Sequence, residues 1–457
     1  MYKEDKKGKE LCDVLAVFEN HVFIFSDKLC TFSSNAEVHV AWDRWYRHTI
    51  DAAAKQIIGA ERYIRMNRPL FLDAKGEQPF PFTLKITDQT KIHRIIVARG
   101  VREACKKFFG GGSGSLIIDT DIIDKNHYCG KQSDLQIPFF SDPVFRIGLV
   151  RNKESFFHVF DDFTLDCIMD ELDTASDFIE YIDAKEELIR SGKIICAPGE
   201  EDILAYYLTT IENEKHCILP RKEIVNNDVL CFEEYWETYS QSNQRKIKIQ
   251  ENKKSYLWDK LLEKSFEYIM NGTLRSTSHC DYNQQAVLFC RFAKPTRVER
   301  RILSEAFVDS WLSAKKRVDF TGNKMQTFIR RSVFASFPDT MLTIVWLHKP
   351  DDEQLESFLN LRKGFLQNKM LSSIPQFPHI RYHIGIAKTI EIEDEDSEDF
   401  IYIDSEDYPP ESDAVKEATS LIGELPAAEI KTYNTTINEY SASKTIQKIP
   451  FPTEFFK

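Results

Sequence analysis

The chain has 457 residues, of which 42% are hydrophobic and 29% charged, a composition that fits folded globular domains and excludes a disordered or fibrous protein. No run approaches the roughly 18 apolar residues of a membrane-spanning helix, and the opening residues lead into no signal-peptide segment, so we expect a cytoplasmic protein with no membrane partner. The ten cysteines include no CxxC pair, which favours reduced thiols over a structural zinc site.

The net charge of −12 comes from one short stretch. Residues 391–413 hold twelve carboxylates and no Lys or Arg, and the other residues sum to zero. Such a near-neutral body is not barred from binding nucleic acid. We expect the acidic segment to mark a domain edge or a mobile loop.

The first elements predicted along the chain are a β-hairpin and a long helix. "DVLAVF" (13–18) and "HVFIFS" (21–26) are short β-branched and aromatic runs with a turn between them, which is typical of paired strands. Asp43 is placed as the cap of an amphipathic helix that follows. Its apolar face repeats at steps of three or four residues and consists of Trp45, Thr49, Ala53, Ile57, Ala60 and Ile64.

A strand at residues 91–100 and a helix at residues 101–109 are predicted next. The glycine-rich run "GGGSGS" (110–115) then invites a phosphate-binding interpretation. That mechanism needs a strand before the loop and a helix after it, so that the helix N-terminus faces the anion. Here the order is reversed, and we interpret the run as a flexible connector.

The remainder predicts helices first and then an α/β unit. Residues 155–275 are mainly helical, and one helix opens with three acids at residues 200–202. Acids in a first helical turn favour the helix dipole, and we prefer this interpretation to a metal or acid–base site. Residues 341–388 alternate strand, helix and strand, which predicts a β-α-β unit. Residues 414–457 are expected to form an irregular tail.

The hairpin carries polar residues at an edge that is otherwise apolar. Alternate side chains of a strand share a face, so Ser26 and Lys28 point one way and Asp27 the other. Asp13 begins the first strand, close across the turn from the end of the second. An acid and a lysine that meet at a sheet edge can hold a divalent cation and a phosphate.

These elements resemble the core of the restriction-endonuclease-like, or PD-(D/E)XK, nuclease superfamily. In that core an aspartate begins one strand, an acid-x-Lys motif closes the next, and a helix and further strands follow. Asp13 matches the aspartate and Lys28 the lysine. The resemblance implies that Asp13 binds Mg²⁺ or Mn²⁺ and that Lys28 orients the attacking water or stabilises the transition state.

The position of the second motif acid is occupied by Ser26, so another carboxylate must complete a metal site. Glu10, three residues before Asp13, is one candidate, and Asp27 is another if a bulge turns the strand by one residue. Some members of the superfamily also carry a glutamine on the following helix, where Gln56 lies here. The family core normally opens with a helix, and only about ten residues precede Asp13.

We therefore predict an α/β protein with an N-terminal restriction-endonuclease-like mixed sheet flanked by helices (1–135), a mainly helical domain (136–275), a C-terminal α/β domain (276–390), and an acidic segment with an irregular tail (391–457). The predicted function is a Mg²⁺- or Mn²⁺-dependent nuclease that cleaves DNA, with RNA as the less favoured substrate, as in bacterial defence or DNA-processing effectors. It would act alone or with a protein partner or second copy. The alternative is a non-catalytic binding or scaffold protein with an inactive nuclease-like fold, in which the acid and the lysine form only a surface ion pair.

Two basic segments, 291–301 and 315–331, could hold a nucleic-acid backbone. From Arg291 to Arg331 eleven Lys or Arg stand against four acids, with interleaved phenylalanines that could stack on bases. The alternative is a solvated helix face with core aromatics. The residues predicted to bind nucleic acid are Arg297, Arg300, Arg301, Lys315, Lys316, Arg317, Arg330 and Arg331.

Overall fold

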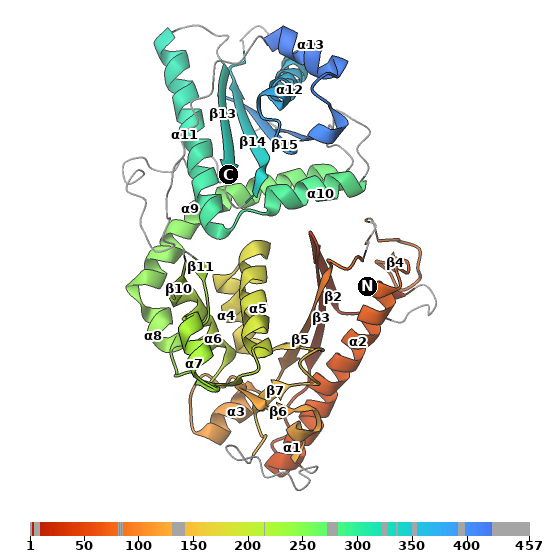
Figure 1. The fold of residues 1–457 in the computed structure, drawn as a ribbon, viewed down its shortest axis with the longest axis vertical. Coiled ribbons are helices and arrows are strands. Elements are labelled where there is room, and N and C mark those ends of the chain that lie inside the picture. The colour runs from red at the N-terminus through yellow and green to blue at the C-terminus, as the bar shows by residue number, and fades with distance from the viewer. Residues whose placement is uncertain are drawn as a thin grey trace. The chain divides into compact units, whose positions relative to one another are not determined.

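The computed structural model is mixed α/β, with helices packed on open, mixed sheets (Figure 1). It divides into two compact units, Met1–Arg245 and Lys246–Lys457. The predicted four-part division differs from this one, because strands and helices beyond residue 135 complete the sheets of the first unit. The residues that the structure describes are 2–3, 10–80, 82, 84, 86–129, 142–213, 215–271, 282–321, 327–334, 337–349, 354–391 and 398–422.

The first unit is built on a four-stranded sheet of order β2-β3-β5-β8. The hairpin β2-β3 is antiparallel, as predicted, and β3-β5 and β5-β8 are parallel pairs. A parallel pair needs a crossover connection, which the helix after the hairpin supplies. The strands are β2 (Val14–Phe18), β3 (His21–Leu29), β5 (Lys91–Arg99) and β8 (His158–Phe160).

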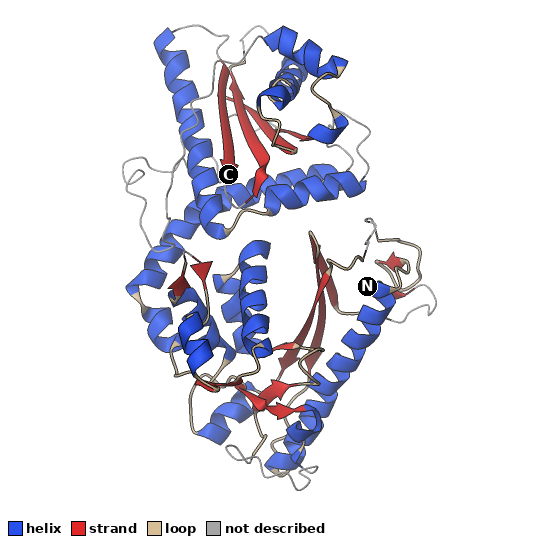
Figure 2. Cartoon of the chain, viewed as in Figure 1, coloured by secondary structure: helices blue, strands red, loops and turns tan. Residues whose placement is uncertain are grey.

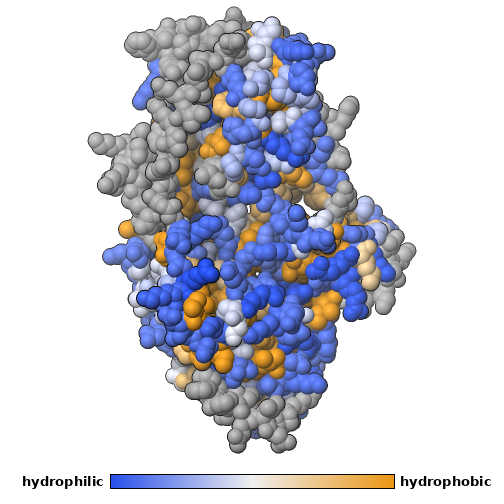
Figure 3. Space-filling model, in the orientation of Figure 1, coloured by the Kyte–Doolittle hydropathy of each residue, from blue (hydrophilic) through white to orange (hydrophobic). Residues whose placement is uncertain are grey.

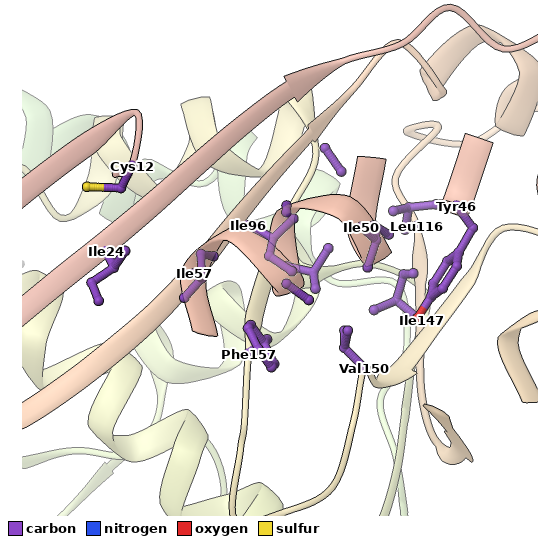
Figure 4. Close-up of a cluster of buried hydrophobic side chains, with 14 of the residues drawn as sticks. Cys12, Ile24, Tyr46, Ile50, Ile57, Ile96, Leu116, Ile147, Val150 and Phe157 are labelled. Atoms are coloured by element: carbon purple, nitrogen blue, oxygen red, sulfur yellow. The ribbon is translucent and has the colours of Figure 1, made fainter. Parts of the chain in front are cut away.

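One face of this sheet is covered by the long predicted helix. It runs through α1 (Val38–Tyr46), a π-helical turn (Arg47–Asp51) and α2 (Ala52–Arg65). All six residues of its predicted apolar face are buried, which confirms the periodicity. Figure 4 shows part of this core, in which Ile24 and Ile96 come from the strands and Ile57 from the helix.

The start of the helix differs from the prediction. Glu37 is the N-cap residue, and its side chain accepts hydrogen bonds from the backbone N–H groups of the first turn. Asp43 lies inside α1 and accepts a hydrogen bond from the backbone N–H of Cys129, at 2.8 Å. Asp43 therefore ties the helix to a distant loop, a role that local sequence does not reveal.

The other face of the sheet packs against helices α4 (Asp162–Glu171), α5 (Ala175–Arg190) and α6 (Glu200–Thr209) and a second sheet of order β12-β9-β6-β7. That sheet contains β6 (Ile117–Ile123), β7 (Arg146–Leu149), β9 (Ile194–Ala197) and β12 (Val229–Cys231). The smaller elements of the unit are β1 (Tyr2–Lys3), β4 (Leu70–Phe71), α3 (Arg102–Phe109), a 3-10 turn (Asp124–His127), β10 (Ile211–Glu212), β11 (Lys215–His216), α7 (Arg221–Asn226) and α8 (Trp236–Gln241).

The three acids that open α6 are buried, so a favourable interaction with the helix dipole is not a sufficient account of them. Glu200 pairs with Lys185 and accepts a hydrogen bond from the hydroxyl of Tyr181 at 2.5 Å. Asp202 accepts two backbone hydrogen bonds from the start of α8, at 2.7 and 2.9 Å. Burial raises the pKa of Glu201 to about 7. Glu200 thus joins α6 to α5, and Asp202 joins α6 to α8.

The second unit contains a four-stranded sheet of order β13-β14-β15-β16, with helices on both faces (Figure 2). The pair β14-β15 is parallel and is connected through α12, which confirms the predicted β-α-β unit. The strands are β13 (Thr327–Phe334), β14 (Phe337–Leu347), β15 (Tyr382–Thr389) and β16 (Asp399–Asp404). The helices are α9 (Asn243–Met270), α10 (Tyr282–Ala293), α11 (Arg297–Thr321), α12 (Leu355–Leu371) and α13 (Asp413–Ile422), with 3-10 turns at Ile374–Gln376 and Ser405–Asp407.

Part of the acidic segment is a strand of this sheet, which corrects the prediction of a loop or domain edge. Strand β16 pairs with β15, and its central residues are buried. Asp399 accepts a 2.7 Å hydrogen bond from the buried guanidinium of Arg362. Glu398 is bonded by Lys264 and Lys388, both at 2.8 Å. Internal cations thus neutralise acids that sequence alone places on a solvated stretch. The start of the predicted irregular tail is also wrong, because α13 (Asp413–Ile422) is a helix; residues 392–397 and 423–457 lie outside the described part.

Glu398 links the stability of the second unit to pH. Burial alone would raise the pKa of its carboxyl group, but the charge of Lys388 and the hydrogen bonds from Lys264 and Lys388 outweigh burial and lower the pKa below its ordinary value of 4.5. Such a group stabilises the folded state above its unfolded pKa, and that contribution is lost as the pH falls through the folded pKa.

We therefore expect the free energy of unfolding to fall more steeply below about pH 4.5 in the wild type than in a Glu398→Gln variant. Urea titrations on either side of that pH measure the difference. Parallel pH profiles for the two proteins would show that Glu398 contributes nothing to this dependence.

Among the described residues, no helix is long and apolar enough to cross a membrane. On the face seen in Figure 3, hydrophobic residues lie scattered among hydrophilic ones. All the cysteines in the described part are free thiols, as predicted.

Candidate active site

Asp13 and Lys28 converge at the end of the hairpin. The Lys28 ammonium lies 3.2 Å from Asp13 Oδ2, and the same oxygen accepts a hydrogen bond from the backbone N–H of Asp27 at 2.6 Å. Asp13 is held in place because its own N–H donates to the carbonyl of Phe25. The side chains of Asp13 and Lys28 are 21% and 28% exposed, so solvent or a ligand can reach both.

The position of the missing second acid is filled by a neutral pair. Ser26 is buried on the face of β3 that α2 covers, and its hydroxyl donates to Gln56 Oε1 at 3.0 Å. Gln56 is thus joined to the strand that carries Lys28, two residues away. Serine and glutamine supply oxygen atoms at this position but no negative charge.

Asp27 faces the other side of the strand and does not replace the second acid. Strand β3 continues past Asp27 in register with β5, without the bulge that this role requires. The Asp27 carboxylate instead accepts hydrogen bonds of 3.0 and 3.1 Å from Arg99. Glu10 is exposed just before the hairpin and stays the candidate for a second carboxylate.

The carboxylates near this sheet end suit a Mg²⁺ ion that is bound by only one or two protein ligands. Mg²⁺ keeps several waters and is often bound through one or two carboxylates together with substrate phosphates. Asp13 offers one partly exposed carboxylate, and Glu10 offers another that is solvent-facing. A site of this kind fits a cation that arrives with a phosphate better than a cation held by protein ligands alone.

Three arginines of the predicted nucleic-acid surface are buried, which corrects their assignment. Arg297 and Arg300 both donate to the carboxylate of Asp259, each at 2.7 Å. Arg301 donates to the side-chain oxygen of Asn252 at 2.8 Å. These guanidinium groups fasten α11 to α9 and cannot reach a nucleic-acid backbone where they lie.

The other predicted basic residues have different positions. Lys315 and Lys316 are exposed on α11, and the Lys315 ammonium lies 5.2 Å from the ring centre of Trp311. Arg331 is half-buried and donates to a backbone carbonyl of α12. The side chains of Arg317 and Arg330 lie outside the described part. Lys315 and Lys316 therefore stay predictions for phosphate contact.

Sequence reasoning missed a histidine cluster on the opposite face of the first sheet. His21, His93 and His158 come from strands β3, β5 and β8, and acids of α5 lie beside them. A signal was present, because three short apolar segments each carry one histidine: "NHVFIF", "KIHRII" and "FHVF".

No family model, curated protein or solved structure matches this chain. The resemblance to the PD-(D/E)XK core stays a prediction.

Proposed function

We propose that the first unit is a metal-dependent nuclease that hydrolyses phosphodiester bonds of DNA. The observation that carries the proposal is the convergence of the Asp13 carboxylate and the Lys28 ammonium at a solvent-reachable sheet end. The order of elements supports it, because a hairpin, a covering helix and a parallel strand follow one another as in the PD-(D/E)XK core that the sequence resembles. Gln56 on that helix is hydrogen-bonded to the strand of Lys28.

Each residue has a distinct role in this proposal. Asp13, with Glu10 as the second carboxylate, would hold Mg²⁺ or Mn²⁺. When bound, such an ion lowers the pKa of water and neutralises charge on the phosphate. Lys28 would leave its ion pair with Asp13 and place its ammonium group against the charge that builds on the phosphate oxygens. The hydrogen bond of Gln56 to Ser26 would keep the end of β3 in place.

The rival function is a non-catalytic binding protein with a nuclease-like sheet. It is favoured by the neutral Ser26–Gln56 pair and by the contact of Lys28 with Asp13, which together leave few charges for a metal. An ion pair as exposed as Asp13–Lys28 contributes only about 0–1 kcal/mol to stability. Its presence at the sheet end therefore does little for the fold.

Incubation of the full chain with supercoiled plasmid and end-labelled linear DNA separates the two functions. The nuclease proposal expects nicking or shortening with Mg²⁺ or Mn²⁺ and none with EDTA. RNA of the same sequence is expected to be cut more slowly. Intact DNA under every metal condition, from a protein shown to be folded, would favour the rival.

Among the acids near the site, Asp27 is expected to be dispensable. Its carboxylate pairs with Arg99 on the other side of the strand, so Asp27→Asn should leave the cleavage rate close to that of the wild type. Both partners are partly exposed, so the free energy of unfolding should change by about 0–1 kcal/mol. Glu10→Gln is the matched comparison and should slow cleavage. A large loss of rate in Asp27→Asn with none in Glu10→Gln would reverse the assignment.

A further inference from the structure

A group of three titratable side chains lies between the first sheet and helix α5. His93 is on β5, His158 is on the neighbouring parallel strand β8, and Glu186 is on α5. One ligand atom of each lies within 4.8 Å of the ligand atoms of the other two. The group lies on the face of the sheet opposite to Lys28. His21, which is hydrogen-bonded to His93, is seven residues from Lys28 on β3, and side chains an odd number of residues apart on a strand point to opposite faces.

The two histidines of the group have buried ring nitrogens without a hydrogen-bond partner among the described residues. Both side chains are almost fully buried, with exposed fractions of 2% for His93 and 1% for His158. Within the described residues, His93 Nδ1 and both ring nitrogens of His158 lack a hydrogen-bond partner. Leaving such groups unsatisfied in a protein interior is unfavourable, and a ligand that binds them would remove that penalty.

The rest of the geometry prepares His93 to donate a lone pair. Its Nε2 lies 2.9 Å from His21 Nδ1, a hydrogen bond that uses this side of the ring. Its Nδ1 then faces Glu186, whose Oε2 is 4.0 Å away. Metal-binding histidines commonly use one ring nitrogen for the metal and the other for an orienting hydrogen bond. His21 would be that orienting partner.

The three side chains differ in their surroundings. Burial lowers the pKa of His93 to about 4, and burial lowers the pKa of His158 well below its ordinary value. Glu186 is partly exposed at 24%; its Oε1 accepts hydrogen bonds of 3.0 and 2.6 Å from Arg190, and its Oε2 is the oxygen that faces His93.

We propose that His93, His158 and Glu186 form a zinc-binding site, with His21 as a positioning residue. Two imidazoles and one carboxylate are a ligand set that zinc accepts, with water in the fourth position. Ligand atoms around a tetrahedral zinc lie about 3.4 Å apart. The 4.0 Å between His93 Nδ1 and Glu186 Oε2 exceeds this by less than an ångström, which a movement of the partly exposed Glu186 side chain can supply.

The neighbouring candidate groups are less suited to a metal. His21, His93 and Asp183 also lie within 4.8 Å, but His21 Nδ1 and His93 Nε2 are hydrogen-bonded to each other, which occupies nitrogens that such a site would need. A third group, His39, Cys129 and Asp142, has its imidazole bonded at both nitrogens.

The test uses the full chain, freed of metal and titrated with Zn²⁺ against a chromophoric chelator. We expect one zinc per chain and, with Co²⁺ as a replacement, visible absorption bands typical of tetrahedral coordination. His158→Gln should abolish this binding. Glu186→Gln, at a partly exposed position that tolerates the change, should weaken it by about tenfold or more, and His21→Phe by about 10- to 100-fold.

Three controls separate this site from its neighbours. Asp183→Asn and His39→Ala should bind zinc as the wild type does, because they alter only the other two groups. Asp13→Asn should also bind it, which keeps the result independent of the proposed nuclease site. Zinc bound no more tightly by the wild type than by Glu186→Gln, or lost in Asp183→Asn instead, would overturn the proposal.

Discussion

Substitution of Lys28 by methionine is expected to slow metal-dependent DNA cleavage about 100- to 1,000-fold. Methionine keeps much of the length and apolar stem of lysine but removes the charge that would stabilise the phosphate in the transition state. The rate under single-turnover conditions, with saturating protein, reports this loss without interference from product release. Because the ion pair with Asp13 is partly exposed, the free energy of unfolding should change by only about 0–1 kcal/mol.

A second lysine of the same unit provides the matched control. Lys55 on α2 also pairs with an aspartate, Asp51, at 2.9 Å, and it is more exposed than Lys28. Lys55→Met should cleave DNA at nearly the wild-type rate. Equal losses in the two variants, or an unchanged rate in Lys28→Met, would remove Lys28 from the catalytic machinery.

The largest expected effect on stability comes from Lys185 on α5. Its ammonium is buried and pairs with the buried carboxylate of Glu200, which opens α6. Lys185→Met leaves that carboxylate inside the protein with the hydroxyl of Tyr181 as its one side-chain hydrogen-bond partner among the described residues. Breaking a buried pair in this way costs about 3–5 kcal/mol. Urea titration measures the loss of unfolding free energy. Hydrogen exchange in peptides of α5 and α6 assigns that loss to the first unit.

The double variant Lys185→Met/Glu200→Leu distinguishes charge from packing. With both charges removed, the unpaired carboxylate disappears and stability should return close to that of the wild type, since apolar replacements of buried pairs are often neutral. A double variant that is as unstable as Lys185→Met would mean that packing at this position, not the unpaired charge, sets the cost.

Local patterns in the sequence predicted the elements that local physics determines. The hairpin follows from alternation and a turn, and the long helix from apolar residues at steps of three and four, all of which are buried. The β-α-β unit of the second domain was found in the same way. These signals are short-range, and a single sequence is enough to detect them.

The errors arose where distant residues decide the outcome. Strand β16 lies within an acidic stretch, and its charges are tolerated because Arg362, Lys264 and Lys388 come from other elements. The sequence pattern places the arginines of α11 on a surface. In the structure they are buried and hydrogen-bonded to Asp259 and Asn252 of α9. Charge patterns along the chain do not show which partners folding brings together.

The candidate active site was predicted only in part. Alternation along β3 placed Lys28 and Ser26 on one side and Asp27 on the other, as the structure has them. The bond of Ser26 to Gln56 depends on how α2 crosses the sheet, so sequence spacing could suggest Gln56 but not its partner. The histidine cluster required the pairing of strands that are far apart in the chain.

A crystal structure of the full chain with a short DNA duplex and Ca²⁺, which supports binding without rapid cleavage, tests the nuclease site most directly. A cation within about 2.3–2.6 Å of an Asp13 oxygen, with the Lys28 ammonium turned from Asp13 to the adjacent phosphate, is the predicted result. DNA bound elsewhere, with the contact between Lys28 and Asp13 intact and no cation beside it, would contradict the proposal.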